Sequence, residues 1–403
     1  MFEEELNALA RADRLRRRCI FSPDLIDLAS NDYLGLASNE RIFERALDRV
    51  RRAGQFGAKA SQLVSGYTQI HRDFENFEAK RHGFEAAIVI GSGFLGNIAL
   101  FETLARKGDL LLIDEEFHAS GLLASRLARS KAEFFAHNSP DDLRSKLLAA
   151  RVSIKPKRIF VAIEGVYSMS GAIADREIFN VARDFGAAVI LDEAHSGGVL
   201  GAKLNGVLDY YKIAPEANET APLAAKEIDR AELGGEFRGI NGQSFLSDRG
   251  LGSGEKYQIV RLGTLGKAFG SYGAYILAAR EIIDFLTTKA KPIIYSTAPS
   301  LFDIAFALEA ARFIARNEKS LRFRAAKARQ IAAEFGYETP SLILPIAVKS
   351  SKAAVDLQKK LLKRGFLVGA IRPPTTKTPQ LRVILRESPA NLRDFFAELQ
   401  KLI

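Results

Sequence analysis

The chain has 403 residues, of which 47% are hydrophobic and 26% are charged. These proportions are ordinary for a globular protein and exclude a disordered or fibrous one. The single cysteine, Cys19, excludes a disulfide framework and a multi-cysteine metal centre, and it is typical of a reducing compartment. No apolar run approaches the roughly 18 residues that a membrane span requires, and the acidic start is unlike a signal peptide. We therefore expect a cytoplasmic protein with no metal site and no membrane contact.

The net charge is +10, from 58 lysines and arginines against 48 aspartates and glutamates. Many soluble proteins carry such a charge, which also suits nucleic acid, an anionic substrate or an acidic carrier protein. The basic residues are spread out, with short clusters at 14–18 and 359–364. The sequence holds no zinc knuckle, homeodomain signature or aromatic RNA-binding motif, so we do not expect a nucleic-acid partner.

Helices are the first elements that the pattern predicts. A charged helix is predicted over 1–18, and apolar residues then recur at helical spacing over 42–50 and from Ile70 to Phe77, before a stop at Gly83. Strands and helices alternate from there to about residue 285. The strands are nearly continuous in apolar residues, which is typical of parallel sheets buried on both faces. They are predicted at 86–90, 110–113, 133–136, 158–163, 187–191, 258–262 and 274–277.

The remainder predicts a smaller α+β unit. It comprises a helix over 301–316, a strand over 342–348, a helix over 353–364, strands over 366–371 and 381–385, and a last helix that begins after Ser388. Residues 211–255 are rich in charge and glycine and predict a surface insertion. We therefore predict an α/β fold with a mostly parallel central sheet. Its expected parts are an N-terminal segment (1–50), a large domain (51–285) and a small C-terminal domain (286–403).

The first motif is Gly91-Ser92-Gly93-Phe94-Leu95-Gly96, which follows a predicted strand and opens a helix. With Asp114 at the end of the next strand, it matches the dinucleotide-binding fingerprint. Amides at a helix N-terminus bind any phosphate, however, and a tight turn without ligand has the same pattern. A dinucleotide-binding oxidoreductase is therefore one open alternative.

The second motif, Asp192-Glu193-Ala194-His195, spells the acidic box of helicases. That interpretation requires a phosphate loop, and the nearest candidate ends in Gly266-Lys267. Arg261 stands at its first glycine position and Ala268 at its hydroxyl position, and the candidate follows the acidic box instead of preceding it. A nucleic-acid-dependent ATPase is thus disfavoured.

The third motif places Lys267 among small and apolar residues, in Thr264-Leu265-Gly266-Lys267-Ala268-Phe269-Gly270. Desolvation would favour the neutral amine, which is the form that attacks a carbonyl, although a lysine in a surface turn has the same pattern. A phosphate turn, a carboxylate at a strand end and a semi-buried lysine are together what pyridoxal 5'-phosphate requires. They would supply the phosphate donors, the partner of the ring nitrogen and the amine that links to the aldehyde.

These motifs, in this order, resemble the α-oxoamine synthases, which are fold-type-I pyridoxal-phosphate enzymes that condense an amino acid with an acyl thioester. The resemblance runs from about residue 10 to the end, apart from 211–255. Its markers are the runs at 30–36, 63–67, 117–120, 164–169, 192–195, 264–270 and 295–298. The family has a glycine–threonine–glycine run where this chain has Ser196-Gly197-Gly198.

The resemblance implies a role for each matching residue. Lys267 would hold the cofactor and act as the base, and Asp192 would pair with the ring nitrogen. His195 would bind the phenolic oxygen, and His118 would stack on the ring and assist catalysis. The remaining implied residues are Gly93, Phe94, Ser168, Thr264 and Thr297 for the cofactor, and Arg16, Asn31, Arg372 and Thr375 for the substrates. Thr297 would come from the partner subunit of a homodimer whose active site lies at the interface.

The runs at 370–375 and 381–383 resemble the members that join L-alanine to a pimeloyl thioester in biotin biosynthesis. The acyl donor would be held on acyl carrier protein or on coenzyme A, and the positive charge would favour encounter with the acidic carrier. A glycine-using member, such as 2-amino-3-ketobutyrate ligase, would keep the cofactor and change the substrates. A scaffold that binds the carrier without catalysis is a further alternative.

Overall fold

The computed structural model describes residues 1–403 except 13, 17 and 215–257. Within the described residues the central sheet has seven strands in the order β2-β8-β7-β6-β5-β3-β4, and all run in one direction except β8. The strands are β2 (Ala86–Ile90), β3 (Leu110–Asp114), β4 (Lys131–Phe135), β5 (Ile159–Glu164), β6 (Ala188–Asp192), β7 (Ile259–Thr264) and β8 (Ala274–Ala278). The predicted α/β fold with a mostly parallel sheet is confirmed.

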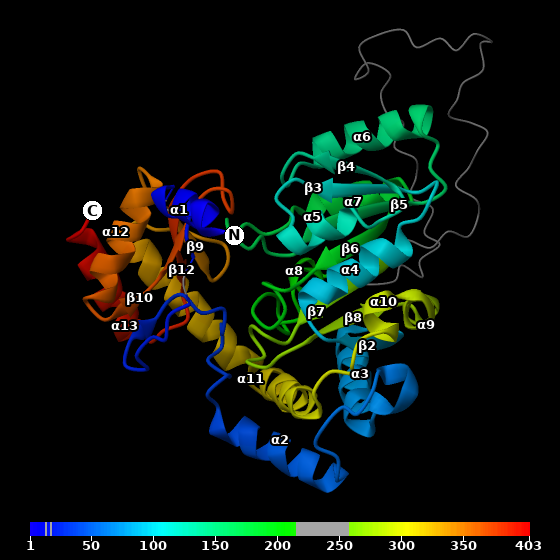
Figure 1. The fold of residues 1–403 in the computed structure, drawn as a ribbon, viewed down its shortest axis with the longest axis horizontal. Helices are drawn as coiled ribbons and strands as arrows, with labels where there is room; N and C mark the ends of the chain where they lie inside the picture. The colour runs from blue at the N-terminus through cyan, green and yellow to red at the C-terminus, as the bar shows by residue number, and fades with distance from the viewer. Residues whose placement is uncertain (13, 17, 215–257) are drawn as a thin grey trace.

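Both faces of this sheet are covered, because successive strand residues point to opposite sides. On β6, for example, Ile190 belongs to one buried cluster while Val189 and Leu191 belong to the other. The first face packs on α4 (Gly93–Leu104), α5 (Ala119–Ser125), α9 (Arg280–Lys289) and α10 (Lys291–Ile294). The second packs on α3 (Gln69–His82), α6 (Pro140–Ser153), α7 (Arg176–Asp184) and α8 (Val207–Tyr211) (Figure 1). This two-sided burial explains the continuous apolar runs in the sequence.

A second, antiparallel sheet forms near the C-terminus in the order β11-β12-β9. It contains β9 (Ile343–Ala347), β11 (Gly369–Ile371) and β12 (Gln380–Ile384), and it is accompanied by α12 (Ser351–Leu362) and α13 (Pro389–Gln400). The early strand β1 (Ile26–Asp27) pairs in parallel with β10 (Phe366–Leu367). The N-terminal part of the chain is thereby tied to this C-terminal unit.

The long helix α11 (Leu301–Glu334) connects the two sheets and packs on α2 (Glu40–Ala53), α3 and α13 (Figure 1). The helix predicted over 301–316 is therefore too short. Asn317 has non-helical torsions inside α11, and its side chain donates to the Phe313 carbonyl at 2.8 Å. A side chain inserted into the helix ladder is a known cause of a kink, so the helix bends at residue 317 and continues.

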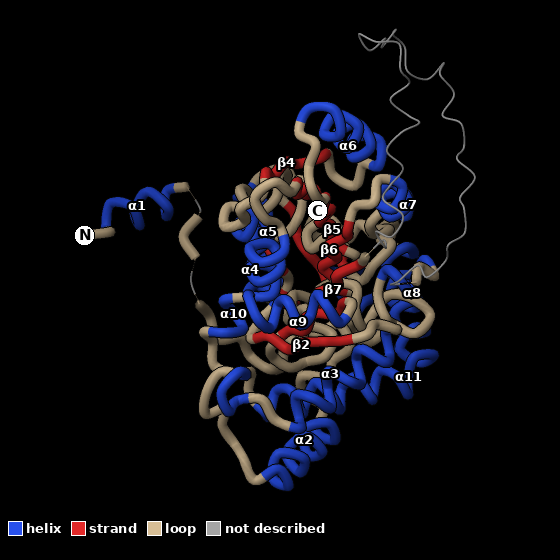
Figure 2. The backbone as a smooth tube through the Cα atoms, turned by 90° about the vertical axis from the view of Figure 1, so that its right-hand side faces the viewer, coloured by secondary structure: helices blue, strands red, loops and turns tan. Residues whose placement is uncertain are grey.

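Two other predictions are wrong in detail. The first helix, α1 (Glu3–Arg11), ends well before residue 18; none of its residues is buried, and it projects from the body of the molecule (Figure 2). The strand predicted over 366–371 is two strands, because its first half pairs with β1 and its second half pairs with β12.

Most of the predicted insertion lies outside the described residues, which resume at residue 258. The division at residues 50 and 285 stays a prediction. Within the described part of the chain, no helix combines the length and the apolar character needed to cross a membrane.

Candidate active site

Polar residues end four parallel strands at the same edge of the central sheet. β3, β5, β6 and β7 finish at Asp114, Glu164, Asp192 and Thr264. The carboxyl ends of parallel strands are where α/β proteins bind ligands. The sequence-predicted site residues gather here, together with several that the sequence did not reveal.

The glycine turn opens helix α4 beside Thr264. Ser92 caps the helix by accepting from the Leu95 amide at 3.2 Å, and the amides of the first turn have no intrahelical acceptor. A Cβ built on Gly93 would meet nothing closer than the Thr264 side chain at 3.9 Å. Gly93, Phe94 and Thr264 thus surround an open space lined by donors, which suits a phosphate.

Asp192 is buried and firmly held. One carboxylate oxygen accepts from the Ala194 amide at 2.9 Å, and the other accepts from Asn97 Nδ2 at 2.8 Å. Asn97 lies one turn after Gly93 on α4, and it also donates to Ser120 Oγ at 2.9 Å. Ser120 Oγ in turn lies 2.7 Å from His118 Nδ1. One network therefore joins the two residues predicted to contact the cofactor ring, and Asn97 was not predicted.

The predicted lysine and histidine lie in direct contact. Lys267 Nζ is 2.6 Å from His195 Nε2, and His195 Nδ1 is 2.6 Å from the Tyr33 hydroxyl. Burial lowers the pKa of Lys267 to about 8, with Asp192 and Glu164 opposing the shift. Burial, followed by the charge of Lys267, holds the pKa of His195 well below its usual range. A lysine that deprotonates near neutral pH beside a neutral imidazole is suited to carbonyl chemistry.

Glu164 is a second buried carboxyl in the site, opposite Asp192 in the register of β5 and β6. One of its oxygens accepts from the Ser168 amide at 3.1 Å, and the other has no partner among the described residues. Burial first, and then the charge of Asp192, raise the pKa of Glu164 well above its ordinary value. Burial and the neighbouring carboxylate thus favour the protonated form of Glu164.

Arg382 is the most important residue that the sequence analysis missed. It is 6% exposed, and it donates from Nε to the Ser168 carbonyl at 2.7 Å and from Nη1 to Asn31 Oδ1 at 3.0 Å. Its Nη2 is buried and has no acceptor within the described part of the chain. Its charge also lowers the pKa of Lys267. An arginine with a free donor beside the reactive amine suits a substrate carboxylate.

Other predicted residues lie farther out. Arg16 Nη2 lies 3.5 Å from Thr375 Oγ1, and both residues line a groove of about 750 Å³ together with Arg372. Leu6 and Leu9 of α1 form the other wall of this groove. Thr297 is exposed in the loop between α10 and α11.

Asp114, the acidic residue of the dinucleotide fingerprint, is already engaged. One of its oxygens lies 2.9 Å from His137 Nδ1, and the other accepts from the Asn138 amide and from the Tyr167 hydroxyl, each at 2.7 Å. Its carboxylate is completely buried. Asp114 is therefore not free to bind the ribose of a dinucleotide. The glycine turn remains a candidate phosphate site, and the dinucleotide interpretation is disfavoured.

The residues present fit pyridoxal phosphate. The open space over Gly93 offers donors for a phosphate, Asp192 is a carboxyl group fixed by two donors, and Lys267 is an amine whose pKa is lowered to about 8. The unpartnered Arg382 Nη2 adds a binding point for an anionic substrate.

Comparison with known proteins agrees with this arrangement. The family model described as aminotransferase class I and II matches residues 23–399, so the chain belongs to that family.

Among named relatives, the chain is 38% identical to 8-amino-7-oxononanoate synthase of Helicobacter pylori strain J99 over 387 residues, which cover 96% of this chain and 92% of the relative. Serine palmitoyltransferase from S. paucimobilis, solved with bound PLP and myriocin, has the same fold. Its TM-score is 0.81 and its identity 22%, over all of this chain and 97% of the other. The 8-amino-7-oxononanoate synthase of Francisella tularensis aligns with a TM-score of 0.68 at 23% identity, over 94% of this chain and 98% of the other.

Proposed function

We propose that this chain condenses L-alanine with a pimeloyl thioester to give 8-amino-7-oxononanoate, carbon dioxide and the free carrier, a step of biotin biosynthesis. The observation that carries the proposal is the contact of 2.6 Å between Lys267 Nζ and His195 Nε2 at the carboxyl edge of the sheet. The relatives named 8-amino-7-oxononanoate synthase support the choice of substrates.

The cofactor is pyridoxal 5'-phosphate, which when bound draws electrons from the α-carbon of an amino acid and so stabilises its carbanion. Asp192 would hold the ring nitrogen, since Asn97 and the Ala194 amide fix its carboxylate. His195 would hold the phenolic oxygen, and the exposed ring of His118 is free to stack on the cofactor. Gly93, Phe94, Ser168 and Thr264 would bind the phosphate and ring substituents.

Lys267 has two tasks in this proposal. Its Nζ would hold the cofactor through the aldehyde, and as a free amine it would remove the α-proton of the amino acid. A pKa of about 8 leaves a useful fraction of this amine neutral at physiological pH. His118 would then assist the loss of carbon dioxide from the product of the carbon–carbon bond-forming step by donating to its developing oxygen charge.

The carboxylate of L-alanine would bind Arg382 and Asn31. Arg382 donates from Nε to the Ser168 carbonyl and from Nη1 to Asn31. Its third nitrogen, Nη2, has no acceptor among the described residues and would bind the substrate. The sequence pointed to Arg372 as a substrate-side arginine without naming the group it binds, and the contacts of Arg382 favour Arg382 for the amino-acid carboxylate. Arg16, Arg372 and Thr375 line one groove and would face the pimeloyl thioester, whose carrier would meet the basic residues around that groove.

The active site would be completed in a homodimer. Large apolar side chains are exposed in the run at 63–67 and in the loop before α11, including Val64 at 78% and Tyr295 at 78%. Burial of such side chains against a second copy is favourable. Thr297, exposed in the same loop, would reach the phosphate of the partner's cofactor. We also propose a cytoplasmic location, which the single cysteine favours.

Turnover measurements test the function. Carbon dioxide release is measured with L-alanine, glycine or L-serine, each paired with pimeloyl-CoA and with pimeloyl-acyl carrier protein. Release with L-alanine at least ten times faster than with glycine or L-serine is expected. Faster release with glycine would instead identify a glycine-using member. Borohydride reduction followed by peptide mapping gives the control, because a bound dinucleotide with no label on Lys267 would refute the cofactor assignment.

A further inference from the structure

We propose that Tyr33 is a positioning residue that fixes the tautomer of His195, so that His195 presents an N–H at Nε2 to the amine of Lys267. The catalytic importance of the Lys267 amine rests on the proposed function. The contacts of His195 with Tyr33 and Lys267 are observed in the folded chain and do not depend on that function. Tyr33 lies in the run at 30–36 that carries the family resemblance, but the resemblance implied no role for it.

The three side chains form one line of contacts. The Tyr33 hydroxyl lies 2.6 Å from His195 Nδ1, and His195 Nε2 lies 2.6 Å from Lys267 Nζ. Tyr33 and His195 are buried, with 3% and 6% exposure. Both ring nitrogens of His195 are therefore occupied, and bulk water does not compete for either of them.

The chemistry of the partners selects the tautomer. A neutral imidazole has one N–H donor and one acceptor nitrogen. Burial raises the pKa of Tyr33 to about 12 and holds the pKa of His195 well below its usual range, so the pair is a neutral phenol and a neutral imidazole. The one hydrogen of the Tyr33 hydroxyl has two acceptors within reach, His195 Nδ1 at 2.6 Å and Asn31 Oδ1 at 3.4 Å. Asn31 Oδ1 already accepts from Arg382 Nη1 at 3.0 Å, and the contact with Nδ1 is the shorter one, so the hydrogen goes to Nδ1. The imidazole proton then resides on Nε2, which faces Lys267.

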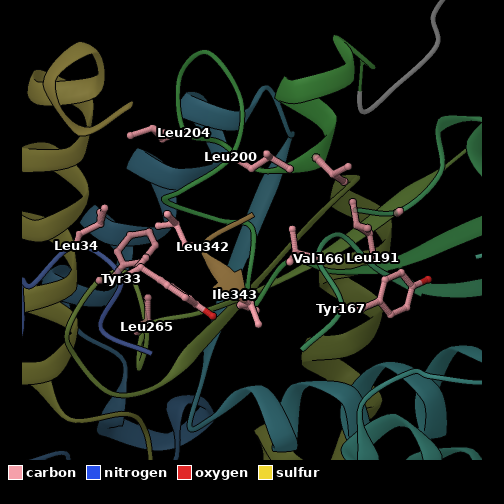
Figure 3. Packing of buried hydrophobic residues seen from close by; sticks show 14 of the residues in the cluster. Tyr33, Leu34, Val166, Tyr167, Leu191, Leu200, Leu204, Leu265, Leu342 and Ile343 are labelled. Carbon is pink, nitrogen blue, oxygen red and sulfur yellow. The ribbon is translucent and has the colours of Figure 1, made fainter. Parts of the chain in front are cut away.

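Tyr33 is held rigidly enough for this task. Its neighbours Leu34 and Leu36 are buried, and Asp32 Oδ1 accepts from the Leu36 amide at 2.9 Å. Arg386 Nε donates to the Asp32 carbonyl at 2.8 Å. The ring of Tyr33 packs in the hydrophobic cluster drawn in Figure 3. The loop that carries Tyr33 is thus fixed on both sides of the residue.

An N–H at Nε2 has a definite effect on the amine. It donates to the lone pair of neutral Lys267, whereas an unprotonated Nε2 would accept from the ammonium form and stabilise the charge. The hydroxyl of Tyr33 therefore favours the neutral, nucleophilic amine. The other groups that act on this line are Asp192 and Glu164, which favour the ammonium, and Arg382 and His118, whose charges disfavour a proton on Lys267 or His195.

Cyanate labelling of the full chain without cofactor tests the inference without any measurement of activity. Cyanate reacts with neutral amines, and peptide mass mapping reports the rate at Lys267 as a function of pH. We expect the midpoint for Lys267 to rise by about 0.5 to 1 pH unit in Tyr33→Phe, the shift that corresponds to one lost hydrogen bond. An unchanged midpoint would overturn the proposal.

Tyr167→Phe is the matched control. Tyr167 is also a buried tyrosine, its hydroxyl donates to Asp114 at 2.7 Å, and it lies apart from Tyr33 in Figure 3. The midpoint for Lys267 should not move in this variant. An equal shift in both variants would mean that any lost tyrosine hydroxyl loosens the site, and it would also contradict the proposal.

A second substitution keeps the test valid if Tyr33→Phe does not fold. Incorporation of 3-fluorotyrosine at position 33 preserves the ring and makes the hydroxyl a stronger donor. The midpoint for Lys267 should then fall below that of the natural chain. A rise or no change would refute the assigned direction of the hydrogen bond. Neither result depends on the substrates, so a failure of the proposed reaction would leave this test intact.

Discussion

Replacing Arg382 with lysine separates two candidate sites for the amino-acid carboxylate. Lysine keeps the positive charge but loses the planar fork of donors. In the natural chain the guanidinium uses Nε for the Ser168 carbonyl, Nη1 for Asn31 and leaves Nη2 free. A single ammonium cannot occupy all three positions, so the donor assigned to the substrate is the one most readily lost.

The size of the effect follows from that one donor. A hydrogen bond to a charged group contributes about 1.5–3 kcal/mol, and each 1.4 kcal/mol corresponds to about a factor of ten in affinity. Arg382→Lys should therefore raise KM for L-alanine about 10- to 100-fold. Its effect on KM for the pimeloyl thioester should be less than about threefold.

Steady-state kinetics with each substrate varied in turn measures this separation. Arg372→Lys is the comparison, because Arg372 lines the groove next to Thr375 and not the contact with Asn31. It should affect KM for the thioester and leave KM for L-alanine within about threefold. The reverse pattern, with L-alanine sensitive to Arg372 alone, would refute the assignment of Arg382. Thermal unfolding of both variants shows whether either effect reflects misfolding.

Three further outcomes are expected. Lys267→Ala should abolish borohydride labelling and lower turnover by at least about 10²- to 10⁴-fold; labelling of another lysine at full yield would contradict its role. In the natural chain without cofactor, the cyanate rate at Lys267 should reach half its maximum near pH 8, because burial lowers this pKa from its ordinary 10.5; a midpoint above pH 10 would show a solvated amine. Gly206→Ala places a Cβ 2.3 Å from Glu193 Oε2 at a φ of +95°, and denaturant unfolding should show a loss of about 3 kcal/mol. Gly54→Ala, with a φ of +66° and nothing within 4 Å, should cost only about 1 kcal/mol, and equal losses would exclude the clash as the cause.

The sequence predicts the central sheet well because burial on both faces leaves a local signature. Each predicted strand from 86 to 277 overlaps an observed one. Pairing with a distant segment leaves no such signature. Phe366–Leu367 and Gly369–Ile371 are adjacent in the chain, yet they pair with β1 and with β12. Only the folded arrangement divides this run into two strands.

The same distinction applies to the site. Asp192 ends a strand, and His195 and Lys267 stand in the turns that follow strands, where a polar residue among small neighbours is conspicuous. Arg382 lies inside a strand. From the sequence alone, an arginine at such a position looks the same as one that points from the sheet into solvent. Asn97 is one polar residue within a helix. Their importance depends on which side chains face them across the fold, and a single sequence does not contain that information.

The hydrogen bond between Arg382 and Asn31 joins a residue translated early to one translated near the end of the chain. A growing chain acquires Asn31 and Tyr33 early, the amine at 267 much later and Arg382 only near the end. Until the last of these has left the ribosome, the strand that carries the guanidinium cannot close over the serine carbonyl at 168. An unfinished chain therefore lacks the guanidinium that Asn31 and the Ser168 carbonyl hold close to the Lys267 amine, and this part of the site forms only when synthesis is nearly complete.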